Sequence, residues 1–251
     1  MKYFVPLPKI YLLNMKKVLF TVLSAVILTS ACGNRQHKEA PSEVISTQQN
    51  EPGDSTRYGL ACDGCTDSLL IFLPYEGGDP DTFDIVSAQE QQRIYGRPHI
   101  GDDMAVVLSA DSVVMAINLS TLRNTWCYQA EPKLRRLAAQ HMKPLPDSIM
   151  RKIMTPREYG FQLKRDHSVR TIGIYRRDNM SPVEYPQVTF YKDWRIWNGR
   201  LILHADTVRG LGKEDIMPQT DTADICLLMR DSLVLRFRDH DQSYYRKKTE
   251  E

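Results

Sequence analysis

Apolar and polar residues alternate along most of the C-terminal half of the chain. In the run RLILHA, residues 200–205, Leu201, Leu203 and Ala205 share one face, which is typical of a half-buried strand. The dipeptide Asn198–Gly199 separates this run from DWRIW, and Asn-Gly between two such runs is a strong β-hairpin signal. Three more strand-like runs follow, divided by turn-forming residues: ADICLLM, LVLRF and SYYRK. This region therefore predicts an up-and-down antiparallel meander.

The same pattern extends upstream. YGFQLKRDHSVRTIGIY reads as two strands with a turn at 165–167, MAVVLSADSVVMAINL as two strands with a turn at 109–111, and TWCYQ as one more strand. Residues 132–141 instead have apolar positions at helical spacing, and Asp147 is a candidate cap for a second short helix that ends before Pro156. The sequence thus predicts a mainly β protein, an antiparallel up-and-down β-barrel with a short helical insertion.

The N-terminus has the pattern of an exported protein. Two lysines after Met15 precede the apolar run VLFTVLSAVILTSA, which ends in the small residues Ser30 and Ala31. This order is typical of a secretory signal peptide, and the run is too short for a transmembrane helix. We interpret residues 1–31 as the signal peptide and Met15 as the true start, because the preceding segment adds nothing that a signal needs.

The segment that follows predicts a lipid anchor. LTSACGN resembles a bacterial lipobox, which implies that Cys32 becomes the lipidated first residue of the mature chain; an ordinary signal peptide with a chance cysteine is the alternative. Residues 32–57 are polar and contain no aromatic side chain, so we expect this segment to be a disordered tether. The acidic cluster of surface-exposed lipoproteins of the Bacteroidetes type is missing after Cys32. This favours a lipoprotein anchored to the outer membrane and facing the periplasm.

Charge argues against a nucleic-acid partner. The full chain has a net charge of +2, but residues 1–31 hold four lysines and no acid. Removing those four from 33 basic residues leaves 29 against 31 acidic residues, mixed along the chain. Nucleic-acid binding requires a basic patch or stripe, and the sequence has none.

Cys62 and Cys65 are separated by two residues in YGLACDGCTDSLLIFLP. Thioredoxin-type chemistry places the first cysteine at a helix N-terminus, whereas a strand-like run follows here. Structural zinc commonly uses four ligands, and Cys127 and Cys226 are isolated from each other. A disulfide, a spare thiol pair or a Cu(I) site remain open for the pair. After lipidation of Cys32 four cysteines are left, so Cys127 and Cys226 are candidates for a second disulfide.

The cysteine segment resembles the opening of the NlpE-type lipoproteins, in which Gly-x-x-Cys-x-x-Cys leads into the first strand of a small lipocalin-like barrel. Gly59 and both cysteines match this motif, while Ala61 replaces the usual proline. The run from DWRIW to SYYRK also follows the strand pattern of that family. The resemblance implies a lipocalin-like domain over residues 58–248, with an insertion at about 76–158. It also implies a link to copper resistance and envelope-stress sensing.

No motif of a hydrolase, nucleotide-binding enzyme or metalloprotease occurs, so we do not expect an enzyme. Trp126, Trp194 and Trp197 are candidates to line a ligand cavity, with core packing as the commoner role. We expect a binding or envelope-sensing module that takes a small hydrophobic ligand or an envelope protein, with no cofactor unless Cu(I) binds. The alternatives are an adaptor without a small ligand and a thiol redox or Cu(I)-handling protein.

Overall fold

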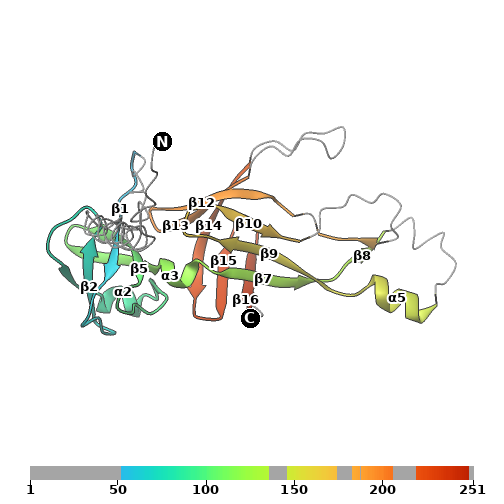
Figure 1. Ribbon diagram of the computed structural model, residues 1–251, viewed down its shortest axis with the longest axis horizontal. Helices are drawn as coiled ribbons and strands as arrows, with labels where there is room; N and C mark the ends of the chain where they lie inside the picture. Colours follow the sequence, from blue (N-terminus) through green and yellow to red (C-terminus); the bar gives the residue numbers. More distant parts are fainter. Residues whose placement is uncertain (1–51, 136–145, 174–182, 187, 206–218, 249–251) are drawn as a thin grey trace, which may run out of the picture. The chain divides into compact units, whose positions relative to one another are not determined.

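The computed structural model describes residues 52–135, 146–173, 183–186, 188–205 and 219–248 (Figure 1). Within these ranges the chain forms a six-stranded sheet, an eight-stranded sheet and a two-stranded ribbon. No helix of the described ranges is long and apolar enough to cross a membrane. The predicted signal peptide, Cys32 and nearly all of the tether lie outside the described residues.

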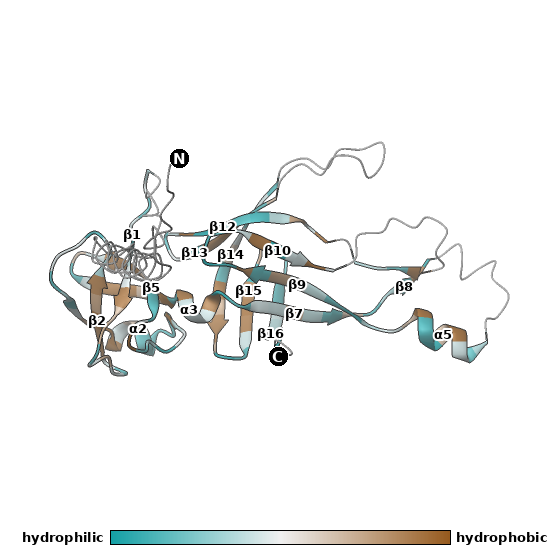
Figure 2. Cartoon of the chain, viewed as in Figure 1, coloured by the Kyte–Doolittle hydropathy of each residue, from teal (hydrophilic) through white to brown (hydrophobic). Residues whose placement is uncertain are grey.

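The first sheet has the strand order β3-β2-β1-β5-β6-β4, and only β4 runs parallel to its neighbour β6. Its strands are β1 (Thr56–Ala61), β2 (Leu69–Pro74), β3 (Asp81–Asp84), β4 (Ile94–Tyr95), β5 (Asp103–Ser109) and β6 (Ser112–Asn118). The alternating residues Leu70 and Phe72 of β2 are fully buried, and Ile85 and Ala88 beside and within helix α2 (Val86–Glu90) join the same core. Figure 2 shows the apolar character of β2. This sheet therefore has a packed core of its own.

The second sheet curls into a nearly closed barrel. Its strands are β7 (Thr125–Ala130), β9 (Arg157–Leu163), β10 (Val169–Ile172), β12 (Tyr191–Trp197), β13 (Arg200–Ala205), β14 (Gln219–Leu228), β15 (Ser232–Arg236) and β16 (Asp241–Arg246). Each of these strands lies beside the next along the chain, and β16 returns to β7. Residues just before β10 connect its end to β12: Ser168 forms a bridge with Asp193, and the Trp194 backbone N–H donates to the His167 carbonyl at 2.9 Å. This order is the up-and-down meander of eight-stranded lipocalin-like barrels, as predicted.

The Asn198–Gly199 hairpin is confirmed. Trp197 pairs with Arg200, and the two turn residues have φ angles of 47° and 77°. Positive φ at both positions is the type I′ geometry that matches the twist of the flanking strands. A Cβ on Gly199 would also lie 2.3 Å from the sulfur of Met115 on β6. Glycine is therefore required both by the backbone and by the space available.

The cysteine-bearing strands do not open the barrel, and that prediction is wrong. β1 pairs with β2 on one side and with β5 on the other, so both of its hydrogen-bonding edges are used within the first sheet. The barrel begins only at β7. The segment 76–158, predicted as an insertion, therefore contributes β3–β6 to the first sheet and β7 to the barrel.

The helical segment is confirmed in part. Helix α5 (Asp147–Ile153) forms, with Asp147 inside its first turn and Pro146 at the cap position. At the start of the other predicted helix, β8 (Lys133–Leu134) instead pairs with β11 (Val183–Glu184). Residues 136–141 of that helix lie outside the described residues.

Candidate ligand-binding cavity

One end of the barrel is filled by large side chains, and we call it the filled end. Trp126 and Trp194 are almost completely buried there, and both indole N–H groups have partners. The Trp126 indole donates to the Leu122 carbonyl at 2.8 Å, and the Trp194 indole donates to the Lys164 carbonyl at 2.9 Å. Leu122 belongs to helix α3 (Leu119–Leu122), which joins β6 to β7. The same apolar cluster includes residues of the first sheet, Ala105 and Ile117.

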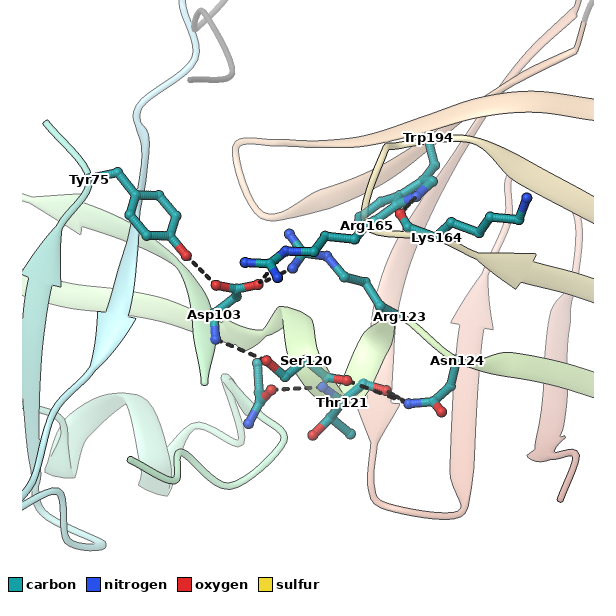
Figure 3. A network of polar contacts seen from close by, with 10 residues as sticks. Tyr75, Asp103, Ser120, Thr121, Arg123, Asn124, Lys164, Arg165 and Trp194 are labelled. Carbon is teal, nitrogen blue, oxygen red and sulfur yellow. Dashed lines mark hydrogen bonds and ion pairs between the residues drawn. The ribbon is translucent and has the colours of Figure 1, made fainter. Parts of the chain in front are cut away.

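A polar network accompanies this packing (Figure 3). The Asp103 carboxylate accepts a hydrogen bond from the Tyr75 hydroxyl and forms an ion pair with Arg123, whose guanidinium lies over the Trp194 ring. Arg165 lies 3.9 Å from the same carboxylate. Burial, followed by the hydrogen bond to Asp103, raises the pKa of Tyr75, so this phenol remains a donor. The network joins β5 and the turn after β2 to the start of the barrel.

The opposite end, which we call the open end, contains a cavity of about 600 Å³. Strands β7, β9, β12 and β16 and the turn between β15 and β16 supply its aromatic wall: Tyr128, Tyr159, Phe161, Tyr191, Phe237 and Tyr244. The rings of Tyr128 and Tyr244 meet edge to face at 5.6 Å, and those of Phe161 and Tyr244 lie 5.1 Å apart. Exposed polar residues of β14 and of the β15–β16 turn form its mouth.

The polar groups of this cavity are mostly paired. The Tyr191 hydroxyl donates to Asp221 Oδ2 at 2.6 Å, and the Gln219 amide donates to Asp221 Oδ1 at 2.7 Å. At the mouth, Asp239 lies 2.7 Å from His240 and beside Arg238. Burial raises the pKa of Tyr191, so this phenol is uncharged at neutral pH. The cavity thus presents aromatic faces inside and mixed charges at its mouth.

Tyr159 differs from these groups. Its side chain is 1 % exposed, and its hydroxyl oxygen is buried without a hydrogen-bond partner in the structure. Such groups are rare, since a buried polar atom without a partner loses its hydration and gains nothing in return. The strand carrying it approaches β7 closely, because a Cβ on Gly160 would lie 1.9 Å from the Trp126 carbonyl oxygen.

The tryptophans predicted to line a cavity do not line this one. Trp126 and Trp194 pack in the core of the filled end, which confirms the alternative role, and Trp197 is partly exposed at the end of β12. The tyrosines were not identified from the sequence. A signal for them exists in the alternation of Tyr159 and Phe161 with polar neighbours, which places both rings on one face of β9.

Cys62 and Cys65 lie in the turn between β1 and β2, partly exposed and not bonded to each other. The Cys65 sulfur accepts a hydrogen bond from the Ile71 N–H at 3.3 Å. Whether the pair closes a disulfide or binds Cu(I) stays a prediction. The described ranges contain no group of three or more His, Cys, Asp or Glu side chains placed to hold a metal ion.

The predicted bridge between Cys127 and Cys226 is wrong. Cys127 lies on β7 and Cys226 on β14, and both β15 and β16 separate these strands. Three strand spacings of about 4.8 Å amount to roughly 14 Å along the sheet. A disulfide requires Cα atoms within about 7 Å of each other. Both thiols are free in the structure.

Comparisons with known proteins give one solved structure to report. No family model matches the sequence, and none of the curated proteins matches it. The chain is similar to a lipocalin-like protein from Bacteroides thetaiotaomicron VPI-5482, with 17% identity over 51% of this chain and 97% of that chain, at a TM-score of 0.31. The fold assignment rests on the strand order of the barrel, an antiparallel up-and-down arrangement of the lipocalin-like type.

Proposed function

We propose that the protein is a binding module that holds a small, mainly apolar molecule in the open end of its barrel. The observation that carries this proposal is the cavity of about 600 Å³ with its aromatic wall. Small-molecule sites are concave, have volumes of about 300–1,000 Å³ and combine aromatic walls with a few polar groups. The cavity agrees in volume and in its aromatic wall, and its polar side chains, nine of the seventeen lining residues, lie mainly at the mouth.

The filled end of the same barrel supports this assignment. There the chain closes the barrel with Trp126, Trp194 and the leucines of α3, and leaves the indole groups hydrogen-bonded. An adaptor that binds only through its outer surface would not need an unfilled open end, because both ends of its barrel could be packed like the filled end. The unfilled aromatic space therefore favours a bound ligand over the adaptor alternative.

The test uses the uncharged fluorescent probe N-phenyl-1-naphthylamine. We expect wild-type protein to bind about one probe with enhanced fluorescence. Thr189→Trp, which places an indole in the cavity wall, should abolish the enhancement. Thr82→Trp, on an exposed position of β3, serves as the matched control and should bind like wild type. No enhancement with wild type, or equal binding by both variants, would refute the proposal.

The location of the module is part of the proposal. Its support is the signal-like run before Cys32, the lipobox resemblance and the missing acidic cluster after Cys32, from which we propose a lipid anchor at Cys32 on the periplasmic side of the outer membrane. Cys32→Ser should move the protein from the membrane fraction to the soluble fraction and leave probe binding unchanged. Continued membrane association of this variant would contradict the lipid anchor.

Cu(I) sensing through Cys62 and Cys65 is a second candidate, which extends the copper and envelope-stress link implied by the NlpE resemblance. It is favoured by two partly exposed thiols in one turn. Thermal melting of reduced wild type and of Cys62→Ser/Cys65→Ser, with and without Cu(I), tests it. A copper-dependent rise confined to wild type supports the metal site, and equal curves would exclude it.

A further inference from the structure

We infer that the cavity selects an uncharged ligand with a flat apolar body and a carbonyl or hydroxyl oxygen that pairs with the hydroxyl of Tyr159. This inference rests on the proposed function and goes further, because it names the chemical class of the ligand and the residue that selects this class over purely apolar molecules.

The position of Tyr159 directs its ring into the barrel. Phe161 and Leu163 follow it at every second position of β9 and belong to the buried core of the barrel. Side chains at alternate positions of a strand share one face. Tyr159 therefore lies on the inner face and forms part of the cavity wall.

Among the described residues that line the cavity, only Tyr159 has a buried side-chain polar atom without a hydrogen-bond partner. The hydroxyl of Tyr191, on the same wall, is satisfied by Asp221 at 2.6 Å. Tyr191 is satisfied within the chain and Tyr159 is not; because the Tyr159 hydroxyl is closed to solvent in the empty protein, a ligand oxygen reaches it only when neighbouring side chains of the cavity wall move aside. A ligand oxygen at this position would remove the cost of the unpaired hydroxyl, so its binding would be favoured over that of a purely apolar analogue.

The surroundings of the hydroxyl favour an uncharged oxygen. Burial raises the pKa of Tyr159 and of Tyr128, whose rings lie 5.8 Å apart, so both phenols are neutral donors at pH 7. The Asp221 carboxylate on the cavity wall already accepts two hydrogen bonds and repels an anion. At the mouth, Arg238 is offset by its neighbour Asp239. The aromatic faces themselves suit a flat apolar body.

The experiment compares three molecules with one shared body: naphthalene, 2-naphthol and 2-naphthoate, each in competition with N-phenyl-1-naphthylamine. For wild type we expect 2-naphthol to bind about 3- to 10-fold more tightly than naphthalene, the effect of one net hydrogen bond. We expect 2-naphthoate to bind most weakly. Tyr159→Phe should bind naphthalene like wild type and lose the preference for 2-naphthol. Tyr245→Phe, an exposed tyrosine outside the cavity, is the matched control and should keep the preference.

The outcomes separate this inference from the proposed function. If wild type binds neither the fluorescent probe nor naphthalene, the proposed function fails. If it binds them but Tyr159→Phe retains the full preference for 2-naphthol, the ligand class is wrong and the binding function stands. Tight binding of 2-naphthoate would likewise overturn the uncharged class.

Stability of the empty protein gives a second, independent measurement. Tyr159→Phe removes an unpaired buried hydroxyl, so its melting midpoint should equal or exceed that of wild type. A lower midpoint would show that the hydroxyl has a partner in the empty protein and would overturn the inference. A third measurement needs no variant: 2-methoxynaphthalene, which only accepts a hydrogen bond, should bind wild type more tightly than naphthalene, and equal binding would contradict donation by Tyr159.

Discussion

The two ends of the barrel use large aromatic side chains in different ways. At the filled end, Trp126 and Trp194 pack against α3 and against β5 and β6, and both indoles donate to backbone carbonyls. At the open end, a comparable set of rings surrounds about 600 Å³ of space, and the buried hydroxyl of Tyr159 has no partner. The same fold therefore contains one end built for stability and one whose polar groups are incompletely satisfied.

The barrel fold alone does not specify a function, and the difference between its two ends is the reason to propose the open end as the binding site. Close packing and complete hydrogen bonding are what a stable interior requires. A site that departs from both, while the other end of the same barrel conforms, is consistent with the binding function that we propose. The comparison makes quantitative predictions, and the largest effects belong to the filled end.

Trp126→Ala should have the largest effect on stability. The substitution removes a side chain that is fully buried in the filled end and its hydrogen bond to Leu122. We expect the free energy of unfolding to fall by about 3–5 kcal/mol, as for other buried tryptophans. Urea unfolding followed by circular dichroism measures it. Trp197→Ala is the control, and since Trp197 is only partly buried its loss should be clearly smaller. Equal losses would show that the filled end is not specially stabilising.

Asp103→Asn tests the polar network of the filled end. The substitution leaves the guanidinium of Arg123, whose side chain is only 14% exposed, without its carboxylate partner. Breaking a buried ion pair at one partner commonly costs about 3 kcal/mol or more. The matched control is Asp81→Asn, which breaks the more exposed pair with Arg57 and should cost less than about 1 kcal/mol. A small loss from Asp103→Asn would mean that the network does not join the first sheet firmly to the barrel.

The strands were predictable because their signals are local. The alternation in β12–β16 and the Asn198–Gly199 turn specify the meander without reference to the rest of the chain. Sheet membership was not predictable, because it depends on pairing between distant segments. β1 pairs with β5, more than forty residues later, and nothing in the sequence of β1 indicates that partner. The sequence therefore predicts the start of the barrel too early in the chain.

The site was predicted less well than the fold, for a related reason. The tryptophans are aromatic residues of the kind that line the cavities of small barrels, but the carbonyls that satisfy their indoles are fixed by tertiary structure, apart from Leu122, four residues before Trp126. The alternation in β9 shows that Tyr159 and Phe161 face the same way. It does not show which end of the barrel remains unfilled, or that one hydroxyl remains unpaired, since both depend on all eight strands together.

Gly199→Val tests how strictly the β12–β13 turn is specified. Residue 199 has a positive φ, which a β-branched side chain resists, and its Cβ would collide with Met115 of β6. We expect a loss of about 1–3 kcal/mol in the free energy of unfolding, the usual cost of a strained backbone residue. Gly199→Asn is the control, because asparagine tolerates this backbone conformation better than valine and isolates the contact with Met115. An unchanged melting midpoint for the valine variant would contradict the turn geometry.

The smallest effect is expected at Glu158, which is adjacent to Tyr159 in sequence but has paired polar atoms. Hydrogen bonds from Lys247 and from the Tyr245 hydroxyl, the latter at 2.8 Å, hold the pKa of Glu158 below its ordinary value of 4.5. A carboxylate with a lowered pKa in the folded state stabilises the protein above the pKa of the unfolded chain. This stabilisation is lost as the pH falls below 4.5 and through the folded-state pKa.

Glu158→Gln should therefore reduce the free energy of unfolding at pH 7 by less than about 1 kcal/mol, because the pair is partly exposed to solvent. The difference between variant and wild type should shrink in acid, since protonation removes the same charge from the wild type. Urea unfolding of both proteins at pH 7 and at pH 3 measures this, with the exposed Glu76→Gln as a control expected to show no difference. A difference that is equal at both pH values would show that Glu158 does not depend on its charge. In that case the hydrogen bonds of Glu158, and not its charge, would be what distinguishes it from Tyr159, whose hydroxyl has no partner.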